Sequence, residues 1–514
     1  MKLKELPIQV QPLPGAMPAF RASLSAAHLR ELCEQARARK ARLVALWGGD
    51  ETRRGAGYAL HLALAFPSGL LWLDVALDAR NPRYPGIADI YPGANRMQRA
   101  CADLLGIVPD DGADSRKWLR HGAWPEGTYP LRKDFDADER HAQRPDRYPF
   151  VAVAGEGVHE IPVGPVHAGT IESGHFRFSV VGEKILRLEE RFGYKHKGIE
   201  KRFESMTLEE GAKLAGRVSG DSTVAYAWAY AMAVEGATGT EPPRRALVLR
   251  GILLELERIA NHLGDLGYLG NDVSLSFGFF QFWRLKEILL RLNASLFGHR
   301  YLMDLVVPGG VARDLERKDA EQLLAQLEAL RAEAAVLQSI YDEHAGAQDR
   351  FIMTGQVLPA LAERMGLVGF AGRASGVVRD LRADYPVPPY QQIAPRVASH
   401  TRGDVAARVS VRFDELFESI RLIQALVQEL PPGAVRSPLA RPGPGAAGVG
   451  WVEGWRGEVL IALETEGGRI HRLHPHDPSW QNWPLLEHAV HGNIVPDFPL
   501  INKSFNLSYS GADL

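Results

Sequence analysis

The apolar positions of the chain follow a strand-like pattern up to about residue 190. Leu60–Phe66 and Leu70–Leu77 are short apolar runs typical of strands, and Ala26–Arg42 before them predicts a helix. Residues 151–190 also predict strands, with polar and apolar positions alternating over Arg177–Val181. This first part of the chain is therefore expected to be rich in sheet.

Beyond residue 190 the apolar period becomes 3.6, which predicts long helices. Thr207 and Glu210 have the spacing of a capping box, in which each residue caps a backbone N–H of the other at a helix start. Three long apolar stripes then predict helices through Leu247–Leu263, Leu323–Ile340 and Val405–Leu430. The second part of the chain is thus expected to be mainly a helix bundle.

Two segments without clear periodicity mark the edges of these regions. Residues 81–149 are dense in Pro, Gly and charged residues, as in a surface extension or an interdomain connection. Residues 441–450, RPGPGAAGVG, have the composition of a linker, and strands are expected after it at Gly457–Leu463 and Gly468–Leu473. We place the domain boundary near residue 150.

The length agrees with more than one domain, because 514 residues correspond to roughly two or three domains of usual size. The predicted fold class is α+β. A small α/β domain with an extended tail over 1–150 is followed over 151–514 by a bundle of long helices with flanking small β-sheets. The 60 Lys and Arg against 62 Asp and Glu give a formal charge of −2, so nucleic acid is not an expected partner.

Cysteine usage restricts the chemistry. Only Cys33 and Cys101 occur, which excludes a disulfide framework and any cluster or zinc site that needs three or four thiolates from this chain. The N-terminal residues have no apolar core of signal-peptide length, and no stretch reaches the roughly 18 apolar residues of a membrane span. A cytoplasmic protein is expected.

The segment GPVHAGTIESGHFRF, residues 164–178, carries candidate chemistry. Glu172, His175 and Arg177 lie in and just after a predicted strand-to-strand turn, which is expected to present them at a cleft. The carboxyl and imidazole groups suit proton transfer or hydrogen bonding to a ligand.

The segment FGYKHKGIEKRFE, residues 192–204, is the second candidate. His196 lies between Lys195 and Lys197, whose charges disfavour the imidazolium form. A neutral imidazole suits a hydrogen-bond donor or a proton relay. The alternative is a solvated helix start of mixed charge.

The remaining motifs are less specific. His474 and His476 in HPHDP have metal-like spacing, but without a third ligand they are expected in a solvated loop before the next helix. The chain has no Walker sequence, no GxGxxG motif after a strand and no GxSxG elbow, so nucleotide binding by this chain has no sequence support.

Several ordered blocks carry a family resemblance. Residues 155–510 resemble the large-subunit family shared by group 4 nickel–iron hydrogenases, of the formate-hydrogenlyase and hydrogenase-4 type, and the 49 kDa subunit of respiratory complex I. The blocks are GEGVHEIPVGPVHAG, GYKHKGIEK, LLELERIANHLGDLG, RASGVVRDLR and PSWQNWPLLEHAVHGNIVPDFPLI. Ahead of them, DIYPGANRMQRACADLLGI and WPEGTYPLRKDF resemble the 30 kDa subunit of complex I, here fused to the same chain.

The chain departs from this family at the metal ligands. Nickel-binding members carry RxCGxC and DPCxxC, whereas this chain has Ser219 and Ser222 at the first motif and Ser508 and Gly511 at the second. A neutral hydroxyl is a weak ligand for a soft metal centre, and glycine offers no ligand. The comparison therefore implies that this chain binds no metal and is not an active hydrogenase.

The complex I side of the family uses the vacated cavity for a quinone headgroup, with a histidine of the GYxHRGxEK motif and a tyrosine. His196 matches the histidine, whereas Gly220 stands at the tyrosine position. The resemblance implies a candidate quinone or acceptor cavity of His196, His175, Gly220 and Asp221. In it, His196 would donate a hydrogen bond or a proton, and Glu172 would connect to a proton path.

The resemblance implies a peripheral-arm subunit of an oxidoreductase complex of the NADH:quinone or hydrogenase-4 type, at the cytoplasmic side of the membrane. An iron–sulfur cluster would lie in a small partner subunit, beside a ferredoxin-like subunit and antiporter-like membrane subunits. NAD would act only through a partner, and this chain would itself bind no cofactor other than a quinone. The alternative is a non-catalytic docking and coupling platform for the iron–sulfur and membrane partners.

Overall fold

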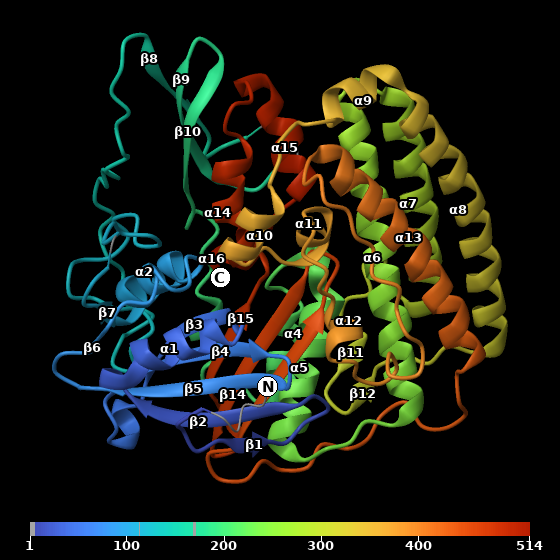
Figure 1. The fold of residues 1–514 in the computed structure, drawn as a ribbon. Helices are drawn as coiled ribbons and strands as arrows, with labels where there is room; N and C mark the ends of the chain where they lie inside the picture. The colour runs from blue at the N-terminus through green and yellow to red at the C-terminus, as the bar shows by residue number, and fades with distance from the viewer. Residues whose placement is uncertain (1–5, 113, 168–170) are drawn as a thin grey trace.

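The computed structural model describes residues 6–112, 114–167 and 171–514. Its N-terminal part is a five-stranded sheet of order β1-β2-β5-β4-β3, antiparallel except for the β2–β5 pair (Figure 1). The strands are β1 Gln11–Leu13, β2 Ala19–Ser25, β3 Arg42–Asp50, β4 Tyr58–Phe66 and β5 Gly69–Leu77. Helix α1, Leu29–Ala38, follows β2, and helix α2, Ala94–Leu105, packs against β3.

The predicted strands β4 and β5 are confirmed, but two expectations in this region are wrong. The helix expected over Ala26–Arg42 ends at Ala38, and Arg42 already begins β3. Nearly every residue of β3 is buried, so the strand lacks the polar alternation that would have revealed it. Helix α2 lies within residues 81–149, which were expected to be a loop-rich tail, together with the short strands β6 Arg83–Tyr84 and β7 Val108–Pro109.

A second, antiparallel sheet of order β10-β9-β8 confirms the strands expected over 151–190. Its strands are β8 Val158–Val163, β9 His175–Val181 and β10 Lys184–Arg191. Residues 168–170 of the candidate segment 164–178 lie outside the described residues. Arg177 in β9 pairs with Glu160 of β8 at 2.9 Å, so it braces this sheet.

Long helices form the bulk of the second part, as predicted. Helices α6, α7, α8 and α13 pack side by side (Figure 1). The helices are α3 Ile199–Phe203, α4 Leu208–Ala215, α5 Thr223–Thr238, α6 Arg244–Asp272, α7 Ser276–Phe297, α8 Arg317–Glu343, α9 Ala345–Phe351, α10 Pro359–Met365, α11 Gly369–Ala374, α12 Leu381–Asp384 and α13 Val405–Gln428. Two short strands, β11 Val306–Val307 and β12 Gly310–Val311, interrupt them. The capping box of Thr207 and Glu210 is present at the start of α4.

The third sheet corrects the expected linker. It consists of β13 Ala447–Glu453, β14 Glu458–Glu466 and β15 Arg469–His476, so residues 447–450 belong to a strand. Gly448 and Gly450 are present because this strand lies directly on α5: a Cβ at either position would collide with the backbone oxygen of Ala233 or Ala229. The chain ends in α14 Ser479–Ala489, α15 Phe498–Phe505 and α16 Tyr509–Asp513.

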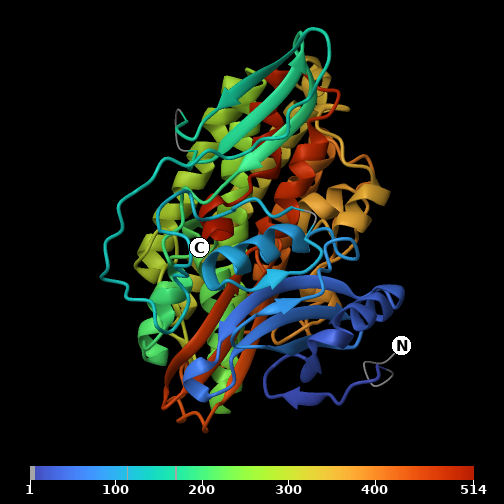
Figure 2. The same ribbon diagram turned by 90° about the vertical axis from the view of Figure 1, so that its left-hand side faces the viewer.

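The N-terminal sheet and the third sheet are joined by partly buried ion pairs. Arg42 of β3 pairs with Glu458 of β14, and Arg21 of β2 pairs with Glu464 of the same strand. Figure 2 shows the blue N-terminal sheet beside the orange strands of the third sheet. One hydrophobic core includes side chains from both sheets and from α5 and α6. The position of the domain boundary near residue 150 stays a prediction.

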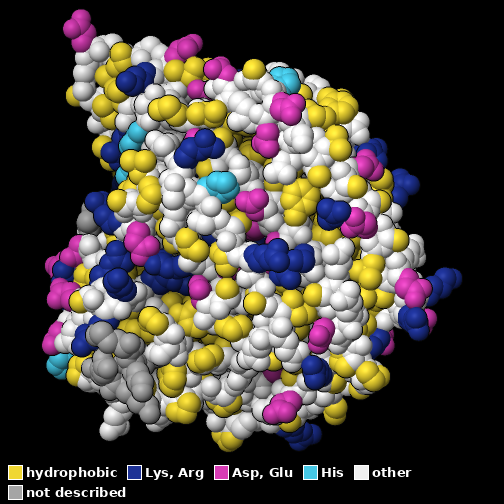
Figure 3. Space-filling view, turned by 45° about the vertical axis from the view of Figure 1, so that its right-hand side comes forward, with side chains coloured by type: hydrophobic (Ala, Val, Ile, Leu, Met, Phe, Trp, Pro, Cys, Tyr) yellow, Lys and Arg dark blue, Asp and Glu magenta, His cyan; other side chains and the backbone are white. Residues whose placement is uncertain are grey.

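The surface carries charges of both signs. On the face shown in Figure 3, Lys and Arg side chains are interspersed with Asp and Glu side chains, in keeping with the formal charge of −2. Among the described residues, no helix is both long enough and apolar enough to cross a membrane.

Candidate functional site

The positions that hold metal ligands in the hydrogenases come together in space. Ser219 Oγ lies 2.8 Å from Ser508 Oγ, although the two residues are 289 positions apart. Ser508 caps α16, and its hydroxyl oxygen accepts a hydrogen bond from the Gly511 backbone N–H at 2.9 Å. Ser222 ends the short 3-10 helix η4, Gly220–Ser222, which directly follows Ser219.

The guanidinium of Arg456 lies among these positions. Its Nη1 donates to Asp221 Oδ1 at 2.8 Å and to Ser222 Oγ at 3.3 Å, and its Nη2 pairs with Asp221 Oδ2. Its Nε donates to the carbonyl oxygen of Asn506. Burial would raise the pKa of Asp221, but the charge and hydrogen bonds of Arg456, together with Ser219 and Lys503, lower this pKa to about 2.

These residues do not fit a nickel–iron centre. Two of the four ligand positions are serine hydroxyls bonded to one another, and a third serine contacts a buried cation. At the fourth position a Cβ on Gly511 would collide with the carboxylate of Asp477, so a cysteine could not be placed there without movement. The donor set lacks thiolates, and Arg456 would repel a metal cation.

A cavity of about 380 Å³ nevertheless remains beside these positions, and we call it the serine cavity. Polar and charged side chains from η4, the end of α6, α15 and α16 form most of its wall. They include Glu172, Ser219, Asp221, Tyr268, Asn271, Asp272, Arg456, Asn502, Lys503, Asn506, Ser508, Tyr509 and Ser510, beside Gly220. Sequence reasoning missed Arg456, Lys503 and the two tyrosines, because no local pattern links them to the ligand positions.

Three of the candidate residues lie in the wall of the serine cavity. These are Glu172, Gly220 and Asp221. Glu172 Oε2 accepts hydrogen bonds from both the backbone N–H and the hydroxyl of Ser510, each at 3.0 Å. His175 is not part of the wall: it is buried in β9, where its Nδ1 lies 3.2 Å from the carbonyl oxygen of Gly164.

His196 lies behind the serine cavity rather than in its wall. Its Nδ1 lies 2.8 Å from the backbone carbonyl oxygen of Asp513, so this nitrogen carries the proton. Burial lowers the pKa of His196, and the Lys197 charge contributes in the same direction, as the sequence predicted. In this neutral tautomer Nε2 offers a lone pair, so His196 accepts rather than donates a hydrogen bond there.

Asp513 of α16 holds the loop of residues 192–198, which carries His196 and which we call the His196 loop. Its carboxylate accepts hydrogen bonds from the backbone N–H groups of Gly193 and Lys195, both at 2.8 Å. Burial raises the pKa of Asp513 to about 7 despite these donors. Because Ser508 and Ser510 belong to the same short segment, α16 positions the serine cavity and the His196 loop together.

Neither tyrosine that follows Gly220 in sequence replaces the missing one. The Tyr226 hydroxyl donates to Asp477 at 2.7 Å, and the Tyr230 hydroxyl donates to the carbonyl oxygen of Leu208 at 2.6 Å. Both side chains are fully buried away from the serine cavity.

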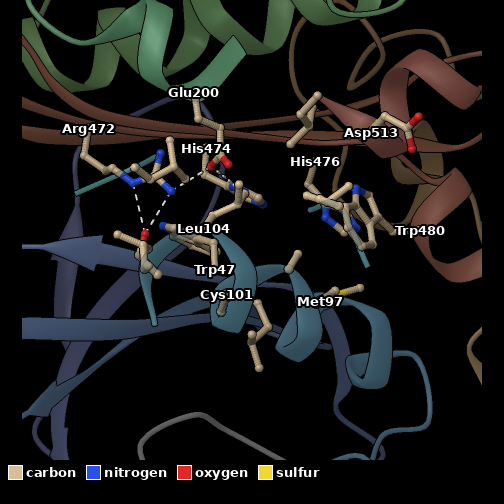
Figure 4. A pocket seen from close by; sticks show the side chains of 17 residues that line it. Trp47, Met97, Cys101, Leu104, Glu200, Arg472, His474, His476, Trp480 and Asp513 are labelled. Carbon is tan, nitrogen blue, oxygen red and sulfur yellow. Dashed lines mark hydrogen bonds and ion pairs between the residues drawn. The ribbon is translucent and has the colours of Figure 1, made fainter. Parts of the chain in front are cut away.

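A second cavity, of about 30 Å³, lies between the N-terminal part and the rest of the molecule; we call it the seam cavity (Figure 4). Glu200 of the GYKHKGIEK motif accepts from Arg472 Nη2 at 2.7 Å and from His474 Nδ1 at 2.8 Å. The ring of Trp47 from β3 stacks on His474 at 5.0 Å. Burial would raise the pKa of Glu200, but Arg472 and His474 lower it to about 2.

The HPHDP histidines are therefore not in a solvated loop, and that expectation is wrong. Both are buried at the end of β15, and His476 Nε2 lies 2.9 Å from Gln481 Oε1. GYKHKGIEK is not a solvated helix start either, because Glu200 is buried at the start of α3. No group of three or more His, Cys, Asp or Glu side chains in the described part of the chain could hold a metal ion.

Two family models match the chain. Residues 22–141 match the 30 kDa subunit of respiratory-chain NADH dehydrogenase, and residues 272–442 match its 49 kDa subunit. The fold and these matches define a fused subunit of the complex I type.

Individual relatives extend this result. Formate hydrogenlyase subunit 5 of Escherichia coli (strain K12) is 33% identical over 484 residues, 92% of this chain and 84% of that protein. Hydrogenase-4 component G of the same organism is also 33% identical, over 92% of this chain and 83% of the relative. The C/D subunit of the NADH-quinone oxidoreductase of Bacteroides thetaiotaomicron is 30% identical, over 82% of this chain and 84% of the relative.

A solved structure shares the fold. It is the membrane-bound sulfane sulfur reductase, an archaeal respiratory membrane complex, with a TM-score of 0.66 at 24% identity, covering 71% of this chain and 100% of the matched chain. The resemblance inferred from the sequence blocks is confirmed. The chain belongs to the family of fused 30 and 49 kDa-type subunits that complex I shares with the formate hydrogenlyase and hydrogenase-4 large subunits.

Proposed function

We propose that this chain is the peripheral-arm subunit of a complex I-like membrane redox complex, and that the serine cavity takes the electron acceptor. The observation that carries the proposal is the volume of about 380 Å³ that remains beside the lost ligand positions. A quinone headgroup is the acceptor that the family resemblance favours. The reaction class is reduction of this acceptor, with no nickel–iron centre involved.

Electrons must reach this cavity from another subunit. Cys33 and Cys101 are the only thiols of the chain; both are buried, and burial raises the pKa of each. Neither is suited to ligate a cluster. We therefore assign the iron–sulfur cluster to a small partner subunit. NAD acts only through a partner, a ferredoxin-like subunit is a further partner, and contact with the membrane at the cytoplasmic face occurs through antiporter-like membrane subunits.

The residues of this chain bind and orient the acceptor. The Arg456–Asp221 pair and the Ser219–Ser508 hydrogen bond fix one wall, and Ser510 holds the Glu172 carboxylate at the other. Glu172 is suited to proton transfer at this wall. His196 lies outside this wall and acts on it indirectly, because its Nδ1 holds the Asp513 end of α16, the segment that carries Ser508 and Ser510.

The alternative is a docking and coupling platform in which the cavity has no ligand. Two observations favour it. First, Ser219 and Ser508, at two of the lost ligand positions, form a hydrogen bond with each other rather than with a ligand. Second, Gly220 leaves the tyrosine position without a side chain. In that case the fold would serve only to transmit movement or charge between partners.

His196 separates these two functions in the purified, assembled complex. We expect His196→Ala to lower acceptor-dependent turnover about ten- to a hundredfold, because it removes the hydrogen bond from Nδ1 to Asp513, worth roughly 1–3 kcal/mol, that holds α16 beside the serine cavity. His196→Asn can keep the donor to Asp513, so it should retain more turnover than His196→Ala.

The measurement is turnover with a quinone analogue, normalised to the amount of this chain in the complex, together with nickel analysis of the same preparation. Unchanged turnover of His196→Ala with intact assembly would reject the acceptor site and leave the platform. About one nickel per chain would reject the assignment of a metal-free cavity.

A further inference from the structure

A third cavity lies on the far side of the Gly220–Asp221 wall, between η4, α6 and α7; we call it the side cavity. Gly220 and Asp221 line both the serine cavity and the side cavity. The side cavity has about 20 Å³ of room, which is enough for one water molecule. Its outer end is formed by Arg300 and Tyr301, and Tyr301 is 46% exposed.

The side cavity holds one buried polar atom without a partner in the described chain, Asn293 Oδ1, and one half-buried ammonium, that of Lys286. The Lys286 ammonium lies beside Gly264 and 5.0 Å from the ring centre of Trp283. Asn293 is only 1% exposed, and its Oδ1 has no partner, whereas its Nδ2 donates to the carbonyl oxygen of Arg300 at 3.3 Å. A water in the side cavity can donate to Asn293 Oδ1.

Glu257 brings a carboxyl group to the same cavity. Its two oxygens accept hydrogen bonds from the backbone N–H groups of Val224 and Ala225, at 2.6 and 3.2 Å. Burial raises its pKa to about 8; the two N–H donors and Arg258 act in the opposite direction, and Asp221 acts in the same direction. Glu257 therefore holds its proton at neutral pH.

The pKa of Lys286 is shifted in the opposite direction. Burial lowers its pKa, and Lys503 adds to this effect, whereas Asp265 and Asp221 oppose it. An acid that keeps its proton and an amine that releases its proton more easily are the groups that proton transfer near neutral pH requires.

We propose that the side cavity is the proton-uptake site of the serine cavity. A water bound at Asn293 takes protons from solvent at Arg300 and Tyr301, and Lys286 and Glu257, which line the same cavity, pass them along the Gly220–Asp221 wall. Gly220 has no side chain to close this passage. The inference rests on the proposed function, because protons are needed there only if an acceptor is reduced.

The proton balance of the reaction is simple. A quinone-type acceptor takes two electrons from the iron–sulfur partner and two protons, and becomes a quinol. Each proton that Lys286 or Glu257 releases toward the serine cavity is replaced from solvent through the side-cavity water. The chain returns to its starting protonation state after each turnover.

The test uses the assembled complex and measures turnover with a quinone analogue between pH 6 and 9. We expect Lys286→Met and Glu257→Gln to lower turnover at least about tenfold, within the range of lost general acid–base catalysis. The loss should deepen as the pH rises, because protons become scarcer. Small primary amines should restore turnover in Lys286→Ala. Lys318→Met, an exposed lysine on α8, is the matched control and should behave like the parent.

Other variants separate failure of the inference from failure of the proposed function. If His196→Ala lowers turnover while Lys286→Met and Glu257→Gln match Lys318→Met at every pH, the uptake site is wrong and the acceptor site stands. If none of them changes turnover, the acceptor site itself is wrong. Should Lys286→Met not assemble, Lys286→Arg keeps the charge but cannot release a proton near neutral pH. Parent-like turnover of Lys286→Arg would overturn the inference.

Discussion

The serine cavity and the seam cavity are both built around an arginine–carboxylate pair, and yet they differ in openness. Asp221 pairs with Arg456 in the first and Glu200 pairs with Arg472 in the second, and each carboxyl pKa falls to about 2. The serine cavity has about 380 Å³ of room, and the Asp221 side chain is 40% exposed. The seam cavity has about 30 Å³, and the Glu200 side chain is 7% exposed.

The same charge chemistry therefore serves two purposes. In the seam cavity the pair is enclosed between two parts of the molecule, so it stabilises their contact. In the serine cavity the pair keeps one wall rigid and leaves room for a ligand. Free volume, rather than the presence of buried charges, distinguishes the serine cavity, the proposed acceptor site, from the seam cavity.

Removal of the seam carboxylate should have the largest effect on stability. Glu200→Ala leaves the buried guanidinium of Arg472 and the ring of His474 without an anion, which should cost about 3–5 kcal/mol. Denaturant unfolding of the purified chain measures this loss. Glu209→Ala, an exposed glutamate on α4, is the control and should stay within about 0.5 kcal/mol of the parent. Equal stability of the two variants would contradict a structural role for the Glu200–Arg472 pair of the seam cavity.

The same pair predicts a pH dependence. The pKa of Glu200 is lowered from 4.5 to about 2, so its ionised form stabilises the folded state. This contribution is complete above about pH 4.5 and is lost as the pH falls toward 2. Between these values the parent should lose more stability than Glu200→Gln.

The corresponding change in the serine cavity should be much smaller. Asp221→Asn keeps an acceptor for Ser219 and for the buried Arg456, and solvent screens the 40% exposed Asp221 side chain, so we expect a loss of about 1 kcal/mol. The same unfolding measurement applies. A loss of stability as large as that of Glu200→Ala would mean that the Asp221–Arg456 pair has mainly a structural role, like the Glu200–Arg472 pair of the seam cavity.

Some elements of the fold could be predicted from the sequence and others could not. Helices α6, α8 and α13 follow from a 3.6-residue period, and strands β4 and β5 follow from short apolar runs bounded by turn residues. The family resemblance placed the four lost ligand positions together. Local pattern failed for β13, where glycines required by close packing on α5 have the composition of a linker.

The parts of the site that stayed hidden depend on contacts between distant segments. Arg456 reaches Asp221 across 235 positions, and Asp513 reaches the His196 loop across 317 positions. The burial of His474 depends on a tryptophan from the N-terminal sheet. No periodicity or short motif encodes such contacts, so only the folded chain reveals them.

The most direct test of the acceptor site adds a side chain at Gly220, in the wall of the serine cavity. A Cβ at this position would meet only Met303 Cε, at 3.8 Å, so Gly220→Ala fits without movement, whereas Gly220→Leu adds a bulky side chain to the wall that the serine cavity shares with the side cavity. Acceptor-dependent turnover of the assembled complex should fall at least about tenfold in Gly220→Leu and stay within about twofold in Gly220→Ala, with equal amounts of the chain in each complex. Equal turnover of the two variants in intact complexes would contradict an acceptor in the serine cavity.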